Sequence, residues 1–217
     1  MKNLIVIFLL FTGLSAFGQT GWQTVKLDTA ISFKLPKGFQ KTKSDSASSF
    51  SAATGFGTIL IFKADDNPVV TPDIERNKHL EAYYNDYIER VEASTSDGKI
   101  TNEKDTIIGD LKAKDFTLEL DTGGGVQVRK FRIIHANSAT YTFEFLFEEM
   151  HREYAAEECN QFFNSITVSE NVGRADQFNA PASDGGGGMS PYLIGLAVLV
   201  IIGIIIYFVI RKKRAVS

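Results

Sequence analysis

The triplet Asp121-Thr122-Gly123 is a stretch whose residue types could do chemistry. In aspartic proteases, two carboxylates share one proton and activate water. Such a site needs a second lobe or a dimer, and the hydrophobic-glycine strand expected after the triplet is absent from the sequence. The run Asp-Thr-Gly-Gly-Gly is also a natural loop between two alternating strands. We therefore predict a hairpin turn here and no catalytic carboxylate.

Carboxylate and imidazole side chains gather before and within a predicted helix, at Glu148, Glu149, His151 and Glu153. These groups can bind metals, but their spacing differs from the two-histidine helical spacing of zinc proteases. Acidic residues are also favoured at a helix start by the helix dipole. The run Asp65-Asp66-Asn67 offers hard oxygens, yet it lacks the alternating ligands, glycine and distal glutamate of a calcium loop. The sequence predicts no metal site.

The chain contains one cysteine, Cys159, so it has no internal disulfide. Its acidic neighbours Glu157 and Glu158 disfavour a reactive thiolate, and we expect Cys159 to fill core space. Neither His79 nor His135 has a serine or cysteine nucleophile placed near it, and no glycine-rich phosphate loop follows a strand. We predict no catalytic, cofactor-binding or metal-binding residue and no enzymatic activity.

Strongly apolar segments lie near both ends of the 217-residue chain, and the part between them is acidic. It holds 18 basic and 26 acidic side chains, a net charge of −8, without a basic stripe interleaved with aromatic residues. Such a surface repels phosphate backbones, so nucleic-acid binding is not expected.

Hydrophobic periodicity in the middle region predicts strands and two helices. The strands cover residues 25–27, 31–35, 48–53, 58–64, 100–108, 111–120, 126–136 and 140–147, and the helices cover 71–93 and 151–164. The first helix opens on a Thr-Pro-Asp start signal, and the last aligns Tyr154, Ala155, Phe162 and Phe163 on its inner side. We predict an α+β sandwich in which an antiparallel sheet of about six strands is flanked by two amphipathic helices.

Three segments resemble the PsbP/Mog1-like domains, including small secreted proteins of the DcrB type. They are Ile31–Phe39, Leu111–Phe116 and Cys159–Ile166, and the resemblance covers roughly residues 22–168. It implies an antiparallel sheet between helices and a scaffolding or binding role. It supplies no catalytic residue, and a C-terminal membrane anchor is a departure from the soluble members.

The ends of the chain indicate export and anchoring. Residues 1–18 have a positive start, an apolar centre and a small-x-small exit, which predicts a secretory signal peptide. Within residues 191–210, the run from Tyr192 to Ile210 is apolar on every side and spans about 29 Å as a helix, and the cations of the tail 211–217 follow. This predicts one transmembrane helix in the cytoplasmic (inner) membrane, with the C-terminus cytoplasmic. The domain, residues 19–168, faces the periplasm or exterior.

Residues 169–190 are rich in Asn, Gly, Ala, Asp and Ser, which predicts a flexible linker with a reach of roughly 25 Å. We therefore expect a membrane-anchored, noncatalytic binding or assembly module with an unknown protein partner. An alternative is a carrier of a small apolar ligand or lipid, suggested by the aromatic residues Tyr83, Tyr84, Tyr87, Phe145, Phe147, Phe162 and Phe163. A hydrolase with an unrecognised site is a third reading.

Overall fold

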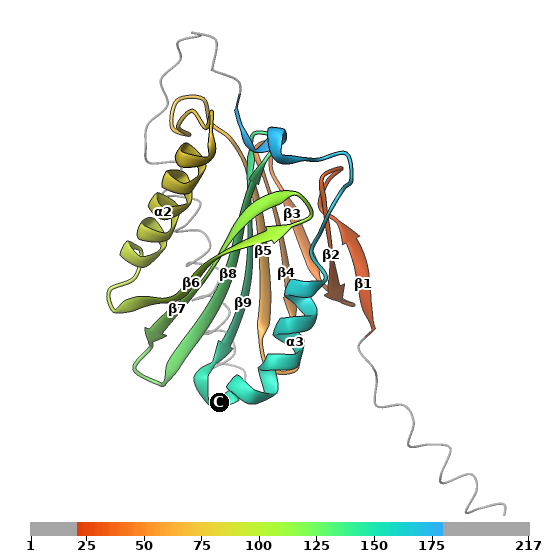
Figure 1. The fold of residues 1–217 in the computed structure, drawn as a ribbon. Coiled ribbons are helices and arrows are strands. Elements are labelled where there is room, and N and C mark those ends of the chain that lie inside the picture. The colour runs from red at the N-terminus through yellow and green to blue at the C-terminus, as the bar shows by residue number, and fades with distance from the viewer. Residues whose placement is uncertain (1–20, 180–217) are drawn as a thin grey trace, which may run out of the picture.

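The computed structural model describes residues 21–179, which form an α+β fold with two antiparallel sheets (Figure 1). The larger sheet has seven strands in the order β3-β4-β5-β9-β8-β7-β6, and the smaller has the order β1-β2-β10. The strands are β1 Trp22–Lys26, β2 Ile31–Pro36, β3 Gln40–Lys43, β4 Ala47–Ala53, β5 Thr58–Asp65, β6 Gly98–Ile108, β7 Leu111–Asp121, β8 Val126–Ala136, β9 Ala139–Glu148 and β10 Thr167–Val168. The helices are α2 Asn77–Ala93 and α3 Arg152–Asn164, with 3-10 turns η1 Glu149–His151 and η2 Arg174–Gln177.

The central strand β9 shows why the sheet is covered on both faces. Its odd-numbered positions from Tyr141 to Phe147 are aromatic and buried, while the even-numbered positions from 140 to 144 carry Thr140, Thr142 and Glu144. Successive side chains of a strand point to opposite faces. The aromatic side chains pack with α3 and β2 in one core, and the polar ones lie on the face that α2 covers.

The two helices lie on opposite faces of the larger sheet (Figure 1). The α3 side chains Ala155, Cys159 and Phe162 recur at four and three residues and join the first core. On the other face, the inner side of α2 packs against Phe116, Leu118, Phe131 and Ile133. The predicted α+β sandwich with two flanking helices is therefore confirmed, although its larger sheet has seven strands.

Two local predictions were wrong. The helix α2 begins at Asn77, because Thr71 closes a turn instead: its amide donates to the Asn67 carbonyl at 2.8 Å and its hydroxyl accepts from the Asn67 amide at 3.0 Å. Tyr154 is 64% exposed and does not face the core. It lies about 100° around the helix from Ala155, which faces the sheet.

The expected start of the flexible linker at residue 169 is too early. Residues 169–179 lie against the folded body, where Val172 and Gln177 are buried and Phe178 packs against the second core. The Asn179 amide donates to the Ile74 carbonyl at 2.8 Å. The predicted boundary rested on the polar composition of residues 169–190, and composition does not reveal the few side chains that anchor residues 169–179.

The remaining predicted segments lie outside the described residues. These are the signal peptide 1–18, the rest of the linker from residue 180, the transmembrane helix 191–210 and the tail 211–217. Between residues 21 and 179, neither helix combines the length and apolar character needed to cross a bilayer.

Candidate functional site

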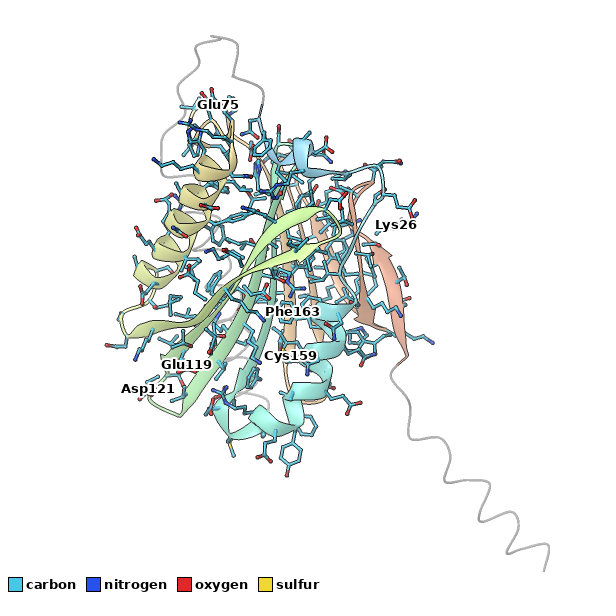
Figure 2. The ribbon with its side chains drawn as sticks, viewed as in Figure 1. Lys26, Glu75, Glu119, Asp121, Cys159 and Phe163 are labelled. Atoms are coloured by element: carbon cyan, nitrogen blue, oxygen red, sulfur yellow. The ribbon has the colours of Figure 1, made fainter. Side chains whose placement is uncertain are left out.

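The protease-like triplet lies in the turn between β7 and β8. The Thr122 amide donates to the Gly125 carbonyl at 3.0 Å, and the Gly123 amide donates to the Asp121 carboxylate at 2.8 Å. Gly123 and Gly125 have φ values of 72° and 140°, which favour glycine. Asp121 lies at the tip of this hairpin (Figure 2). The turn prediction is confirmed.

Of the acidic cluster expected at the start of the last helix, Glu149 alone is held in an ion pair within the described residues. Arg152 binds both carboxylate oxygens of Glu149, at 2.7 and 2.6 Å, and reaches Glu119 at 3.3 Å. The hydrogen bonds from Arg152 lower the pKa of Glu149. Within residues 21–179, no three His, Cys, Asp or Glu side chains are grouped so that they could hold a metal ion.

Cys159 is a core residue on α3 with 2% of its surface exposed (Figure 2). Burial raises the pKa of its thiol, against a smaller opposite effect of Lys130 and Arg132. A raised pKa keeps the thiol protonated and poorly nucleophilic. Burial, and not the charge of its acidic neighbours, is therefore what makes Cys159 unreactive.

His135 is fully buried at the end of β8 nearest the β8–β9 turn. Its Nδ1 lies 3.0 Å from the Gln177 carbonyl oxygen, and its Nε2 lies 3.0 Å from an Asp66 carboxylate oxygen. These two contacts join the end of β8 to η2 and to Asp66, the residue that follows β5. Asp66 belongs to the run Asp65-Asp66-Asn67, for which the sequence predicted no calcium loop.

Gln177 and Tyr84 complete this group, which we call the His135 network (Asp66, Tyr84, Lys112, His135 and Gln177). The Gln177 side chain accepts from the Lys112 amide at 2.8 Å and donates to the carbonyls of Lys112 and His135 at 2.8 and 2.9 Å. The Tyr84 hydroxyl donates to the Lys112 carbonyl and accepts from the His135 amide. Burial raises the pKa of Tyr84 above its usual range. These groups fasten η2 to the sheet and to α2.

Two cross-strand ion pairs lie on opposite faces of the sheet. The Arg129 guanidinium holds the Glu144 carboxylate at 2.5 and 3.1 Å, and both side chains are at most 7% exposed. Arg132 binds Asp115 at 2.7 and 2.8 Å and donates to the Phe163 carbonyl at 3.0 Å, at the end of α3. Both arginines use their planar geometry for bidentate pairing. These charges are committed to contacts within the fold.

A groove of about 400 Å³ lies beside β10, lined by residues that include Lys26, Asp28 and Thr167. The Asp28 carboxylate already accepts hydrogen bonds from the Tyr141 hydroxyl at 2.7 Å and from Lys63 at 3.0 Å. The Ala30 and Ile31 amides also donate to it, at 2.8 and 3.0 Å. The Asp28 carboxylate in this groove therefore stabilises the turn between β1 and β2.

The turn between β4 and β5 is attached to α3 by a carboxylate. Glu158 accepts hydrogen bonds from the Gly55 amide at 2.8 Å and the Phe56 amide at 3.1 Å, one on each oxygen. A side chain at Gly57 would lie 2.6 Å from the Phe145 ring and 2.7 Å from the Leu146 carbonyl, so glycine is required there. This arrangement fixes the backbone on both sides of Phe56.

Phe56 is the centre of an exposed group that we call the aromatic patch (Phe56, His151 and Tyr154). Its ring stacks on Tyr154 at 5.1 Å between centroids and lies 5.8 Å from the His151 ring. The exposed fractions are 43% for Phe56 and 64% for Tyr154. Two of the six large apolar side chains exposed between residues 21 and 179 therefore lie against each other in this patch.

Comparison with known proteins identifies the fold. No family model matches the sequence, and no curated protein sequence is similar to it. The solution structure of the cyanobacterial PsbP protein from Synechocystis superposes with a TM-score of 0.52 at 12% identity, covering 71% of this chain and 96% of that one. The domain has a PsbP-like fold.

Two further structures are more distant. LpqN of Mycobacterium tuberculosis, described as involved in cell envelope biogenesis, has a TM-score of 0.43 at 11% identity, covering 70% of this chain and 92% of its own. The Ran-binding protein Mog1p of Saccharomyces cerevisiae has a TM-score of 0.40 at 10% identity, covering 74% and 100%. The resemblance predicted from the sequence is confirmed for the PsbP-like fold alone.

The PsbP-like fold separates the aromatic residues that suggested a ligand carrier. Tyr83, Tyr84 and Tyr87 lie with α2 on one face of the sheet, whereas Phe145, Phe147, Phe162 and Phe163 lie in the core on the other face. The Tyr83 and Tyr87 hydroxyls bond to Thr140 and Thr142 at 2.6 and 2.8 Å. These side chains fill two cores and do not surround one cavity.

Sequence reasoning missed the aromatic patch. It depends on Phe56 and Tyr154, which are almost one hundred residues apart in the chain. The available signal was an aromatic residue between two glycines in a turn, where a core role is unusual. The His135 network was missed as well, because its members come from five separate segments.

Proposed function

We propose that this protein is a membrane-anchored, noncatalytic binding or assembly module whose domain lies outside the cytoplasm. The sequence patterns of residues 1–18 and 191–210 support the export and the anchor. The exposed aromatic patch supports the binding role, and it is the observation that carries the proposal. Several candidate polar side chains, namely Asp121, Asp66, His135 and Glu149, hold structural contacts, which supports a noncatalytic role.

The position of the patch suits a tethered binder. The docked segment 169–179 ends beside the β8–β9 turn, where the Asn137 amide donates to the Asp176 carbonyl at 2.7 Å. The patch lies beyond Glu148, at the other end of β9. Ten residues of antiparallel strand separate the two ends by about 30 Å. The surface for a partner and the point where the chain leaves the domain therefore lie at opposite ends.

The anchor is tested with the full-length protein in sealed membrane vesicles of both orientations. We expect alkaline carbonate to leave the protein in the membrane. Protease should digest the domain only in vesicles that expose the extracytoplasmic side. A variant lacking residues 191–210 serves as the control and should be released. Release of the full-length protein by carbonate, or digestion of the domain from the cytoplasmic side, would contradict the proposal.

A further inference from the structure

We infer that the aromatic patch docks into an apolar pocket that is rimmed by Lys or Arg side chains on a partner protein. The inference rests on the proposed binding role and specifies the partner of that same surface. It depends on three observations: the rigidity of the patch, the charge around it and its place in the fold.

The patch is held in place before any partner arrives. Glu158 fixes both amides next to the exposed ring of Phe56, and that ring stacks on Tyr154 from a different element. Such aromatic pairs stabilise each other beyond the effect of their buried area. Preorganised aromatic side chains lose little entropy on binding, which is why they dominate the centres of protein interfaces.

The surroundings of the patch are acidic. Glu153 and Glu157, on the same helix as Tyr154, are exposed there, and no ion pair engages either carboxylate within the described part of the chain. The nearby cation Arg152 is already bound by Glu149 and Glu119. A partner with basic groups around an apolar centre complements this pattern. Anionic lipid headgroups and nucleic acids carry the wrong charge.

The position of the patch also favours a protein as its binding partner, rather than the bilayer that we propose holds the anchor. The patch lies at the end of β9 remote from Asn179, the last residue seen to bind the domain. A partner at the patch therefore meets the side of the domain that faces away from the chain's exit. A second copy of this chain would present the same acidic rim, so self-association through the patch is opposed by charge.

The test uses site-specific photo-crosslinking in the full-length protein in its own membranes. The photoreactive residue p-benzoylphenylalanine replaces Phe56 in one variant and Tyr154 in another. Val69 is the control position, because it is a 50% exposed apolar side chain just after β5, at the opposite end of the domain. We expect one protein adduct of the same mass from both patch positions and none from position 69.

Charge reversal then tests the basic rim. The double variant Glu153→Lys/Glu157→Lys, combined with the crosslinker at Phe56, should lower the adduct yield about tenfold, and raising the salt concentration should lower it in the unchanged protein. Glu75→Lys is the matched control, since Glu75 lies near the start of α2, far from α3 (Figure 2). It should leave the yield unchanged. Equal protease resistance of all variants shows that they are folded.

Several results would overturn the inference. These are adducts with lipid alone, an adduct of two copies of this chain, equal adducts from position 69, or no adduct at all. An adduct yield that changes neither on charge reversal nor with salt concentration would show that the partner pocket has no rim of Lys or Arg side chains. The vesicle test gives a separate result. If carbonate releases the protein but the adduct still forms, the anchor is refuted and the docking surface stands. If the protein stays in the membrane but no adduct forms, the docking surface alone is refuted.

Discussion

The two ends of β9 differ in which side chains are buried: polar side chains are buried at one end, and aromatic side chains are exposed at the other. At the end near Ala139, the His135 network buries an imidazole ring, a glutamine side chain and a tyrosine hydroxyl, and each has hydrogen-bond partners within the fold. At the end near Glu148, the aromatic patch exposes Phe56 and Tyr154 to solvent. Burying a polar group costs free energy unless it is hydrogen-bonded, whereas an exposed apolar cluster gains free energy when a partner covers it. The first end fastens the chain, and the second is the surface that we propose for a partner.

Gln177→Ala should have the largest effect on stability. It leaves the Lys112 amide without its acceptor and takes a donor away from the buried carbonyls of Lys112 and His135, so the free energy of unfolding should fall by about 3 kcal/mol. Urea denaturation of the detergent-solubilised full-length protein measures this change. Gln161→Ala, at an exposed position of α3, is the control and should change the value by less than about 0.5 kcal/mol. Equal effects of both substitutions would contradict the role of the His135 network.

Asp28 makes the same end of the molecule sensitive to acid. Burial raises the pKa of Asp28, but hydrogen bonds from Tyr141, Lys63 and two backbone amides together outweigh it, so the pKa lies below the ordinary value of 3.8. A carboxyl whose pKa is lower in the folded state stabilises the fold above the unfolded value, and this contribution is lost as pH falls through the folded pKa. The urea midpoint should therefore fall with pH below about 4.

Asp28→Asn tests this assignment. The variant should be less stable at pH 7 and should lose less stability than the unchanged protein between about pH 5 and pH 2. Asp45→Asn, at an exposed position, is the control and should follow the unchanged protein. Parallel pH curves for Asp28→Asn and the unchanged protein would show that another group causes the acid sensitivity.

Glu158→Gln separates the support of the aromatic patch from the patch itself. The neutral amide oxygen accepts only one of the two turn amides, and the loss of the second charge-assisted bond should destabilise the turn by about 1–2 kcal/mol. Hydrogen exchange of the Gly55 and Phe56 amides should become faster. Glu157→Gln, the neighbouring exposed residue, should leave both amides unchanged. Unchanged exchange in Glu158→Gln would mean that other contacts hold the turn.

Phe56→Ser should have the smallest effect on stability and sharpens the contrast between the two ends. The side chain is already 43% exposed, so its removal should cost about 1 kcal/mol or less, mainly through the lost stacking on Tyr154. Urea denaturation again provides the measurement. Phe145→Ser, in the buried core, should cost several times more. If Phe56→Ser lowered the free energy of unfolding as much as Phe145→Ser, Phe56 would be a structural residue and not a surface for a partner.

The parts of the fold that could be predicted from sequence were those with regular local patterns. The bounds of β8 were correct, and β4 and β5 were correct to within one residue at each end, because alternation and turn residues mark them. All four residues of β3 are exposed and polar, so this strand is defined only by its pairing with β4. The His135 network and the aromatic patch both depend on contacts between segments that are distant in the sequence, and local sequence patterns do not reveal such contacts.

The docking of residues 169–179 has a consequence for how the domain would meet a partner. It shortens the segment predicted to be flexible from 22 residues to 11, those from 180 to 190. The root-mean-square reach of such a chain falls from about 25 Å to about 18 Å. In the membrane-anchored arrangement that we propose, the volume available to the domain would shrink accordingly, and its effective concentration toward a binding site on the same membrane would rise about threefold. Fastening a few residues would then favour encounters with membrane neighbours over encounters in bulk solution.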